Sequence, residues 1–100
     1  MRFTWNLARD CLSRAYEQCL AYELNLAIIK FEVQVPLPVE YKQIKLDCGY
    51  RVDLLVDDRL IIELKSVEQL LKIHQAQLLT YMKLTKVKVG LLMNFKAYLA

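Results

Sequence analysis

Apolar and polar positions follow two different spacings along this chain, one typical of helices and the other of strands. Apolar side chains recur at helical spacing over residues 10–28, which predicts a first helix capped at its start by Asp10. The same spacing returns over residues 73–84 and predicts a second helix with Ile73 and Leu84 on one stripe. The segment between the helices therefore has to supply most of the sheet.

The residues that follow the first helix alternate with the period of a strand. From Phe31 to Val39, the side chains on one face are apolar and those on the other are mainly polar. Pro36 and Pro38 donate no ladder hydrogen bond, so we expect this strand to lie at a sheet edge or to end early. A turn then leads into another strand that starts at Ile44.

Three further extended segments complete the predicted sheet. Two are short apolar runs separated by a polar turn, and the third is a nearly continuous apolar run late in the chain. These segments are residues 50–56, 60–65 and 87–93. A continuous apolar strand is typical of one covered on both faces, and we expect this of the last segment.

Length and composition agree with a single small domain over residues 1–100. Apolar residues make up 56% and charged residues 25%, a balance that excludes an intrinsically disordered chain. The apolar runs are too short to cross a bilayer and the sequence starts without an export signal, so we expect a soluble protein with no membrane partner. Cys11, Cys19 and Cys48 lack metal-binding spacing and fit reduced thiols in a cytoplasm.

Two acidic residues and a lysine stand in the two short apolar runs. Successive side chains of a strand point to opposite faces, so Asp53 and Glu63 share a face only if the turn between their strands is odd in length or carries a bulge. We predict that Val56 pairs with Leu60. This pairing sets Asp53 opposite Glu63 and puts Lys65 on the same face.

Two carboxylates that face each other repel, and either a raised pKa or a cation between them relieves the repulsion. Mg²⁺ suits such oxygen ligands and keeps several waters, one of which could attack a phosphorus atom. Lys65 could orient that water or neutralise charge on a phosphate. In the alternative, Asp53 and Glu63 are surface acids of an ordinary hairpin, paired with Arg51 and Lys65. Spacing by itself leaves both interpretations open.

Several blocks of this sequence resemble one known family. The spacing of Asp53 from Glu63-Leu64-Lys65 is similar to the D…ExK signature of the PD-(D/E)xK nuclease superfamily. The neighbouring sequence resembles the GxxExxY family within that superfamily. The resemblance lies in residues 16–24, 49–56, 73–81 and 90–95.

This resemblance implies an α/β, restriction-endonuclease-like fold with an α-β-β-β-α-β core, in which helices flank a central mixed sheet. It implies metal ligands at Asp53 and Glu63, a catalytic lysine at Lys65, and Mg²⁺ or Mn²⁺ as the cofactor. In RecB-like members of the superfamily, a glutamine followed four residues later by a tyrosine lies beside the metal, and Gln77 and Tyr81 match that pattern. We therefore expect Gln77 to orient Lys65, phosphate or water; a core amide bonded to backbone is the alternative.

The chain departs from the GxxExxY motif near its N-terminal end. Asp10 and Ser13 stand where the motif has Gly and Glu, and only Tyr16 is retained. In the wider superfamily a glutamate on the first helix often assists the metal. Glu17 lies one helical turn beyond Ser13 and is our candidate for a third metal ligand.

These residues predict a metal-dependent nuclease that acts on nucleic acid, with DNA as the expected partner. The net charge of +3 permits such a partner without requiring it. The alternative is a nuclease-fold module that no longer cuts and binds nucleic acid or a protein partner, and a toxin-type RNase is a third hypothesis. A homodimer that cuts both strands is compatible with so small a chain. We expect His74 at the surface of a helix start rather than in the role of a base.

Overall fold

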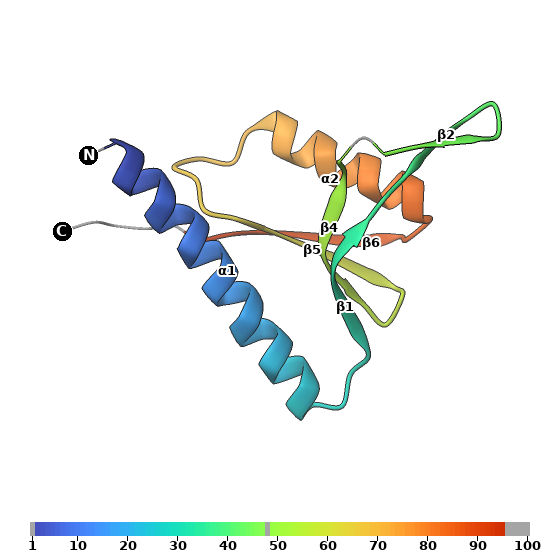
Figure 1. Cartoon of the computed structure of the whole chain (residues 1–100). Coiled ribbons are helices and arrows are strands. Elements are labelled where there is room, and N and C mark those ends of the chain that lie inside the picture. Colours follow the sequence, from blue (N-terminus) through green and yellow to red (C-terminus); the bar gives the residue numbers. More distant parts are fainter. Residues whose placement is uncertain (1, 48, 96–100) are drawn as a thin grey trace.

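The computed structural model describes residues 2–47 and 49–95, with the side chains of residues 2–12 left aside. Two helices and six strands follow one another along this part of the chain (Figure 1). They are α1 (Arg2–Leu26), β1 (Phe31–Pro36), β2 (Val39–Tyr41), β3 (Ile44–Leu46), β4 (Arg51–Val56), β5 (Leu60–Lys65), α2 (Lys72–Thr85) and β6 (Val89–Asn94).

Four strands form the central sheet in the order β1-β4-β5-β6. The neighbours β1 and β4, and β4 and β5, are antiparallel, whereas β5 and β6 are parallel and connected through α2. The elements that make up the sheet and its two helices therefore read α-β-β-β-α-β along the chain. This confirms the predicted α/β, restriction-endonuclease-like core with a mixed sheet.

The strand predicted from Phe31 to Val39 ends early, as its prolines led us to expect. β1 stops at Pro36 and lies at an edge of the sheet. The chain then forms a separate two-stranded hairpin, β2 and β3, which projects from the rest of the molecule (Figure 1). Lys42 and Gln43 at its tip both have positive φ angles, 48° and 69°, as a tight hairpin turn requires.

The first helix is longer than predicted at one end and shorter at the other. α1 starts at Arg2, so Asp10 lies inside the helix and the prediction that it caps the first turn is wrong. No Gly or Pro stands in residues 2–26, so nothing in the sequence stops the helix before Asp10. At its other end α1 finishes at Leu26 rather than at the predicted Ile28, whose φ of 57° is left-handed.

The β4–β5 hairpin has the predicted register. Val56 pairs with Leu60 across a turn of three residues, and Leu54 pairs with Ile62. Asp57 and Asp58 in the turn have left-handed φ angles of 52° and 55°, a conformation that aspartate tolerates better than most residues. The odd turn length keeps both acids of the predicted site in step.

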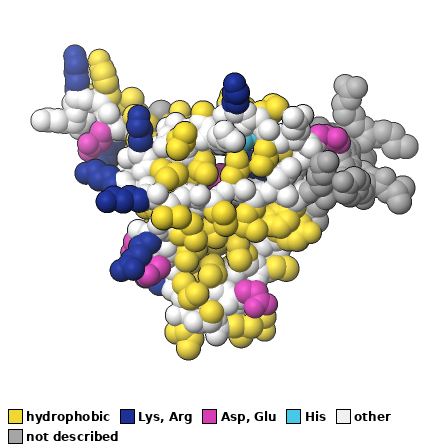
Figure 2. Space-filling view, turned by 180° about the vertical axis from the view of Figure 1, so that it is seen from behind, with side chains coloured by type: hydrophobic (Ala, Val, Ile, Leu, Met, Phe, Trp, Pro, Cys, Tyr) yellow, Lys and Arg dark blue, Asp and Glu magenta, His cyan; other side chains and the backbone are white. Residues whose placement is uncertain are grey.

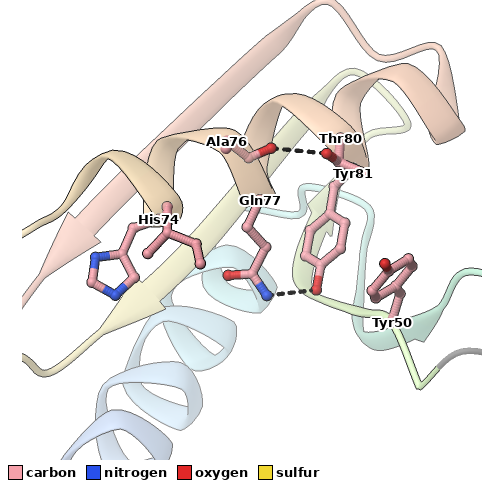
Figure 3. Close-up of a pocket in the computed structure, with 7 residues that line it drawn as sticks. Tyr50, His74, Ala76, Gln77, Thr80 and Tyr81 are labelled. Atoms are coloured by element: carbon pink, nitrogen blue, oxygen red, sulfur yellow. Dashed lines mark hydrogen bonds between the residues drawn. The ribbon is translucent and has the colours of Figure 1, made fainter.

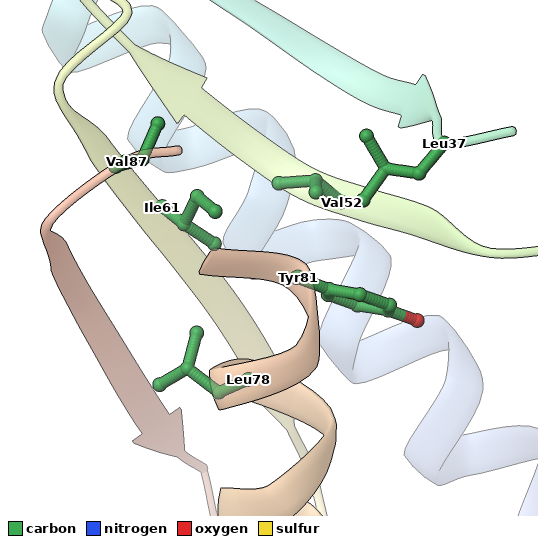
Figure 4. Packing of buried hydrophobic residues seen from close by; sticks show 6 residues of the cluster. All are labelled: Leu37, Val52, Ile61, Leu78, Tyr81 and Val87. Atoms are coloured by element: carbon green, nitrogen blue, oxygen red, sulfur yellow. The ribbon is translucent and has the colours of Figure 1, made fainter. Parts of the chain in front are cut away.

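Hydrophobic side chains pack on both faces of the sheet. Under α2 lies the cluster drawn in Figure 4: Leu37, Val52, Ile61, Leu78, Tyr81 and Val87. The cluster on the α1 face is formed by Leu54, Val56, Ile62 and Leu64, against which Leu20 and Leu24 of α1 pack. In a regular strand Val52 would point to the same face as Leu54 and Val56, yet it packs on the α2 face. The strand pleat is interrupted beside it, where Gln34 of the neighbouring β1 has a φ of 51°.

The second helix extends over Lys72–Thr85, one residue beyond the prediction at each end, but its buried face is different. Leu78 and Tyr81 are the buried residues, whereas Ile73 is 69% exposed and Leu84 is 39% exposed. The predicted stripe is therefore wrong. The helix turns Leu78 and Tyr81 toward the sheet, which leaves Ile73 at the surface.

The last strand, predicted over residues 87–93, begins at Val89 and is not covered on both faces in the part of the chain that the structure describes. β6 lies at the sheet edge opposite β1. Leu92 packs under α2 and Met93 under α1, but Val89 and Leu91 are 57% and 47% exposed. Only the Met93 end of the strand belongs to the α1 cluster, because α1 does not extend over the rest of this edge.

The structure also bears on the expectations about membrane-spanning segments and about the cysteines. Among the described residues, no helix combines the length and the apolar character that crossing a membrane needs. Cys19 is a free, exposed thiol, on a different side of α1 from Leu20 and Leu24, which pack against the sheet. Cys48 and the side chain of Cys11 lie outside what the structure describes.

Candidate active site

Asp53 and Glu63 are held together where β4 and β5 separate. The paired register of the two strands ends at Leu54 and Ile62. Just beyond that point, the backbone N–H of Asp53 donates a hydrogen bond to Oε1 of Glu63 at 3.0 Å, and the N–H of Leu64 donates to Oδ2 of Asp53 at 2.8 Å. Here carboxylate oxygens accept the backbone N–H groups that carbonyl oxygens accept in a regular sheet. The carboxylate of each acid is therefore held by the backbone of the neighbouring strand.

Glu63 is the most enclosed acid of the site, with only 3% of its surface exposed. Burial raises the pKa of its carboxyl group from the ordinary 4.5 to about 7, and the negative charge of Asp53 adds to this rise. The N–H of Asp53 and the ammonium of Lys65 act in the opposite direction and lower the pKa. Glu63 therefore binds a proton near neutral pH unless another positive charge comes close.

Lys65 points toward α2, where it meets Gln77. Its ammonium group donates a hydrogen bond to Oε1 of Gln77 at 2.9 Å, and Nε2 of Gln77 donates to the hydroxyl oxygen of Tyr81 at 2.9 Å. The glutamine is therefore bonded to side chains, not to backbone. The structure thus places Gln77 in contact with Lys65, while its orienting role stays a prediction, and Tyr81 restrains Gln77 in turn.

Glu17 approaches the site through a residue that the sequence did not single out. Nε2 of Gln34 donates to Oε2 of Glu17 at 3.0 Å and to Oδ1 of Asp53 at 3.3 Å, so one amide links α1 to β4. Gln34 lies opposite Asp53, between the paired positions Val33–Leu54 and Val35–Val52. Only the pairing of β1 with β4 reveals this contact, and that pairing joins segments about twenty residues apart.

A polar pocket of about 310 Å³ opens between α1 and the carboxylate of Asp53. Ser13 lines it beside Glu17. The exposed Arg14 brings a positive charge to the same pocket. The full lining is Ser13, Arg14, Glu17, Gln34, Asp53 and Leu64.

The sequence placed both acids and Lys65 on one face of the hairpin, but in the structure Asp53 and Lys65 do not line the same pocket. Asp53 lines the polar pocket, whereas Lys65 does not and bonds to α2 instead. Glu63 lies between the two, because it bonds to Asp53 and its pKa responds to Lys65. The groups form a continuous line across the open end of the hairpin.

The acids of this line fit a hard divalent cation. Asp53 and Glu63 each use one carboxylate oxygen to accept a backbone N–H, and their second oxygens are oxygen ligands of the kind that Mg²⁺ and Mn²⁺ take. Burial raises the pKa of Glu63, and a cation close to its carboxyl group would act in the opposite direction. Glu17 is not gathered with them: within residues 2–47 and 49–95, no three His, Cys, Asp or Glu side chains form a ready-made metal cluster.

His74 occupies the helix start that the sequence suggested. Its Nδ1 accepts a hydrogen bond from the backbone N–H of Leu71 at 2.9 Å. The backbone N–H of His74 in turn donates to the carbonyl oxygen of Leu71 at 3.0 Å. The imidazole therefore satisfies the first turn of α2.

One comparison with known proteins gives a match. A family model described as the PD-(D/E)XK nuclease superfamily matches residues 3–100 of the chain. No curated protein and no solved structure matches it.

Proposed function

The chain belongs to the PD-(D/E)XK nuclease superfamily, and from this premise we propose that it is a divalent-metal-dependent nuclease that hydrolyses phosphodiester bonds of DNA. Within the superfamily we assign it to the GxxExxY family, on the sequence blocks given above. The observation that carries the proposal is the pair of backbone hydrogen bonds at the open end of the hairpin, from Asp53 N–H to the Glu63 carboxylate and from Leu64 N–H to the Asp53 carboxylate.

Asp53 and Glu63 are the proposed metal ligands, and Mg²⁺ or Mn²⁺ is the proposed cofactor. Such a cation would supply positive charge to the phosphate oxygens and make a nearby water more acidic. Glu63 must be ionised to serve as a ligand, and its surroundings oppose this in the absence of a cation. The backbone N–H groups that hold both acids fix their second oxygens in direction.

Lys65 is the proposed group that activates the attacking water, and Gln77 positions it. A lysine ammonium is a flexible point charge, so a bond from its Nζ to Oε1 of Gln77 restricts where that charge lies. Tyr81 in turn restricts Gln77. The chain Tyr81–Gln77–Lys65 thus restricts the amine to a position from which its charge acts on the carboxylate of Glu63.

Glu17 is proposed to assist rather than to complete the metal site. It lines the same pocket as Asp53 and lies one helical turn beyond Ser13, where the family motif has its glutamate. Its carboxylate reaches Asp53 through the amide of Gln34. We expect Glu17 to bind a water of the cation, since it is held one amide away from Asp53.

The test is cleavage of single-stranded DNA, duplex DNA and RNA in the presence of Mg²⁺ or Mn²⁺. We expect Asp53→Ala and Lys65→Ala to reduce the rate at least ~100-fold, because each removes a group with no substitute in the site. Glu40→Ala and Lys45→Ala on the projecting β2–β3 hairpin are matched controls with an acid and an amine removed at exposed positions. Circular dichroism checks that all four variants remain folded.

A clean preparation in which Asp53→Ala cleaves as fast as the unaltered protein contradicts the assignment. Cleavage of RNA alone replaces DNA by RNA as the substrate and leaves the residue roles unchanged, which is the toxin-type RNase hypothesis.

The second candidate function is a module of this fold that binds nucleic acid or a protein without cutting. Ser13 favours it, because the pocket lacks the glutamate of the family motif at that position. This module would bind DNA and show no metal-dependent cleavage with any of the three substrates. The same assay therefore separates the two candidates.

A further inference from the structure

A second pocket, of about 500 Å³, lies beside α2 and next to the candidate active site. Figure 3 shows His74 and Tyr50 at its two ends, with Gln77 and Tyr81 between them. Its lining residues are Tyr50, Ile73, His74, Ala76, Gln77, Thr80 and Tyr81. None of the functions assigned above uses this space.

The two pockets differ in charge. The pocket at Asp53 is lined by two acids and an arginine, whereas no Asp, Glu, Lys or Arg lines the pocket at Tyr50. An uncharged pocket with aromatic walls does not attract a phosphate group, which needs positive charge or N–H donors. It suits a flat, uncharged ring.

Tyr50 offers a surface on which such a ring can stack. Its side chain is 38% exposed, and its ring lies 5.9 Å from that of Tyr81 at an angle of 58°. The buried Tyr81 thus supports one side of Tyr50 and leaves part of the ring open to the pocket. Ile73, which is 69% exposed, adds an apolar group to the lining.

Polar groups of the lining match the edge of a nucleobase. Nδ1 of His74 accepts the N–H of Leu71, so in the neutral imidazole the proton lies on Nε2, which is a free donor. The hydroxyl group of Thr80 donates to the carbonyl oxygen of Ala76 at 2.9 Å and keeps its lone pairs as acceptors. A base carries donors and acceptors of both kinds on its edge.

Gln77 connects this pocket to the catalytic groups. It lines the pocket and accepts the hydrogen bond of Lys65 at 2.9 Å. The negative charges of Glu63 and Asp53 also act on the hydroxyl group of Tyr81 and contribute to raising its pKa, after burial. A ring in the pocket would therefore lie one residue, Gln77, away from Lys65 and from the bond that is cleaved.

We infer that this pocket binds the nucleobase adjacent to the phosphodiester bond that is cleaved, and that the substrate is a single-stranded nucleic acid. The inference rests on the proposed function, because the water that Lys65 is proposed to activate attacks the phosphate next to this base. In a duplex the bases are paired and stacked, so a base reaches the pocket only from a single strand or after extrusion from the helix. Stacking on an aromatic side chain is a common way to bind single strands without reading their sequence.

The experiment measures binding in EDTA, where cleavage does not interfere. The probes are a fluorescein-labelled single-stranded DNA, the same strand annealed to its complement, and the same strand with abasic sites, all followed by fluorescence anisotropy. We expect the intact single strand to bind at least ~10-fold more tightly than the other two. Tyr50→Leu should lose about tenfold in this affinity, and Tyr50→Phe should retain it, because phenylalanine also stacks.

Tyr22→Leu is the matched control, since Tyr22 is a 62% exposed tyrosine on α1. Ala76→Leu is a second variant that fills the pocket from an exposed helix position, and it too should weaken single-strand binding about tenfold. Thermal melts monitor folding, and if Tyr50→Leu unfolds, Ala76→Leu decides the question.

Equal binding of single strand, duplex and abasic strand overturns the inference. A Tyr50→Leu variant that binds as tightly as Tyr22→Leu overturns it too, and so does the absence of any binding. The proposed function fails in a different way. A protein that binds single strands through Tyr50 but never cleaves them with Mg²⁺ or Mn²⁺ keeps the base pocket and loses the nuclease assignment. If Tyr50→Leu cleaves DNA at an unchanged rate, the nuclease assignment stands and the base pocket is lost.

Discussion

At the scale of single residues, Glu63 has the most unusual surroundings in the described structure. It is a carboxyl group with 3% exposure, hydrogen-bonded to the backbone of one acid and influenced by one lysine. Burying a charge without a full complement of partners is unfavourable, and the raised pKa of Glu63 expresses that penalty. The N–H of Asp53 and the ammonium of Lys65 offset only part of that penalty, so further positive charge would stabilise the ionised form of Glu63.

The first prediction concerns the pH dependence of stability in EDTA. The pKa of Glu63 is about 7 in the folded protein and close to 4.5 when unfolded, so between these values the folded state holds more protons. Its contribution to the free energy of unfolding is therefore fully present below pH 4.5 and is lost as the pH rises through 7. We expect a loss of up to about 3 kcal/mol from this residue.

Urea denaturation at pH 5 and pH 8, with and without Glu63→Gln, measures this loss. Glutamine keeps the oxygen that accepts the N–H of Asp53 and removes the titration. Between pH 5 and pH 8, the free energy of unfolding of the unaltered protein should fall relative to that of Glu63→Gln. Parallel profiles for the two proteins would show that Glu63 ionises normally.

At the scale of elements, the β4–β5 hairpin and the α2–β6 unit position the site. The three-residue turn fixes the register that sets Asp53 beside Glu63, and α2 carries Gln77 over Lys65. The position of α2 depends on its close packing against β6 at Gly90. A Cβ atom added there would lie 2.6 Å from Sδ of Met82 and 3.1 Å from Cγ of the buried Leu78.

We therefore predict that Gly90→Val destabilises the fold by about 2 kcal/mol, because the added atoms push α2 away from the sheet. Nuclease activity should fall as well, since α2 carries Gln77. Denaturant titration measures the first effect. Val89→Thr on the neighbouring, 57% exposed position is the control and should change stability by less than about 0.5 kcal/mol. Equal stability of the two variants would mean that α2 can move without loss.

At the scale of the whole molecule, the candidate site joins both layers of the fold. Glu17 comes from the helix on one face of the sheet and Gln77 from the helix on the other, while Asp53 and Glu63 lie between them. Hydrophobic side chains also remain exposed over the middle of the face seen in Figure 2. Because the proposed ligands come from two strands of the same sheet, a bound cation should stabilise the sheet and the helices packed on it.

We expect 10 mM Mn²⁺ to raise the melting temperature of the protein by about 5 °C. Glu63→Gln should show little of this rise, whereas Glu40→Ala on the β2–β3 hairpin should show all of it. Calorimetric titration of Mn²⁺ gives the matching heat of binding. An equal rise in Glu63→Gln would place the cation elsewhere on the molecule.

The sequence by itself determined the order of elements, the mixed sheet and the register of the central hairpin. These features depend on local spacing: alternation defines β4 and β5, and the odd turn at Asp57 and Asp58 keeps Asp53 in step with Glu63. Pro36 likewise ended β1 where its missing N–H required. Such information lies within a few residues of the position that it governs.

Only the tertiary structure decided which faces the helices turn inward and which groups meet across elements. Helical spacing pointed to Ile73 and Leu84, but packing against the sheet buried Leu78 and Tyr81 instead. The bridge from Gln34 to Glu17 and Asp53 joins three elements, and the pKa of Glu63 follows from how deeply those elements bury it. Contacts of this kind depend on the simultaneous packing of distant segments, which no local pattern encodes.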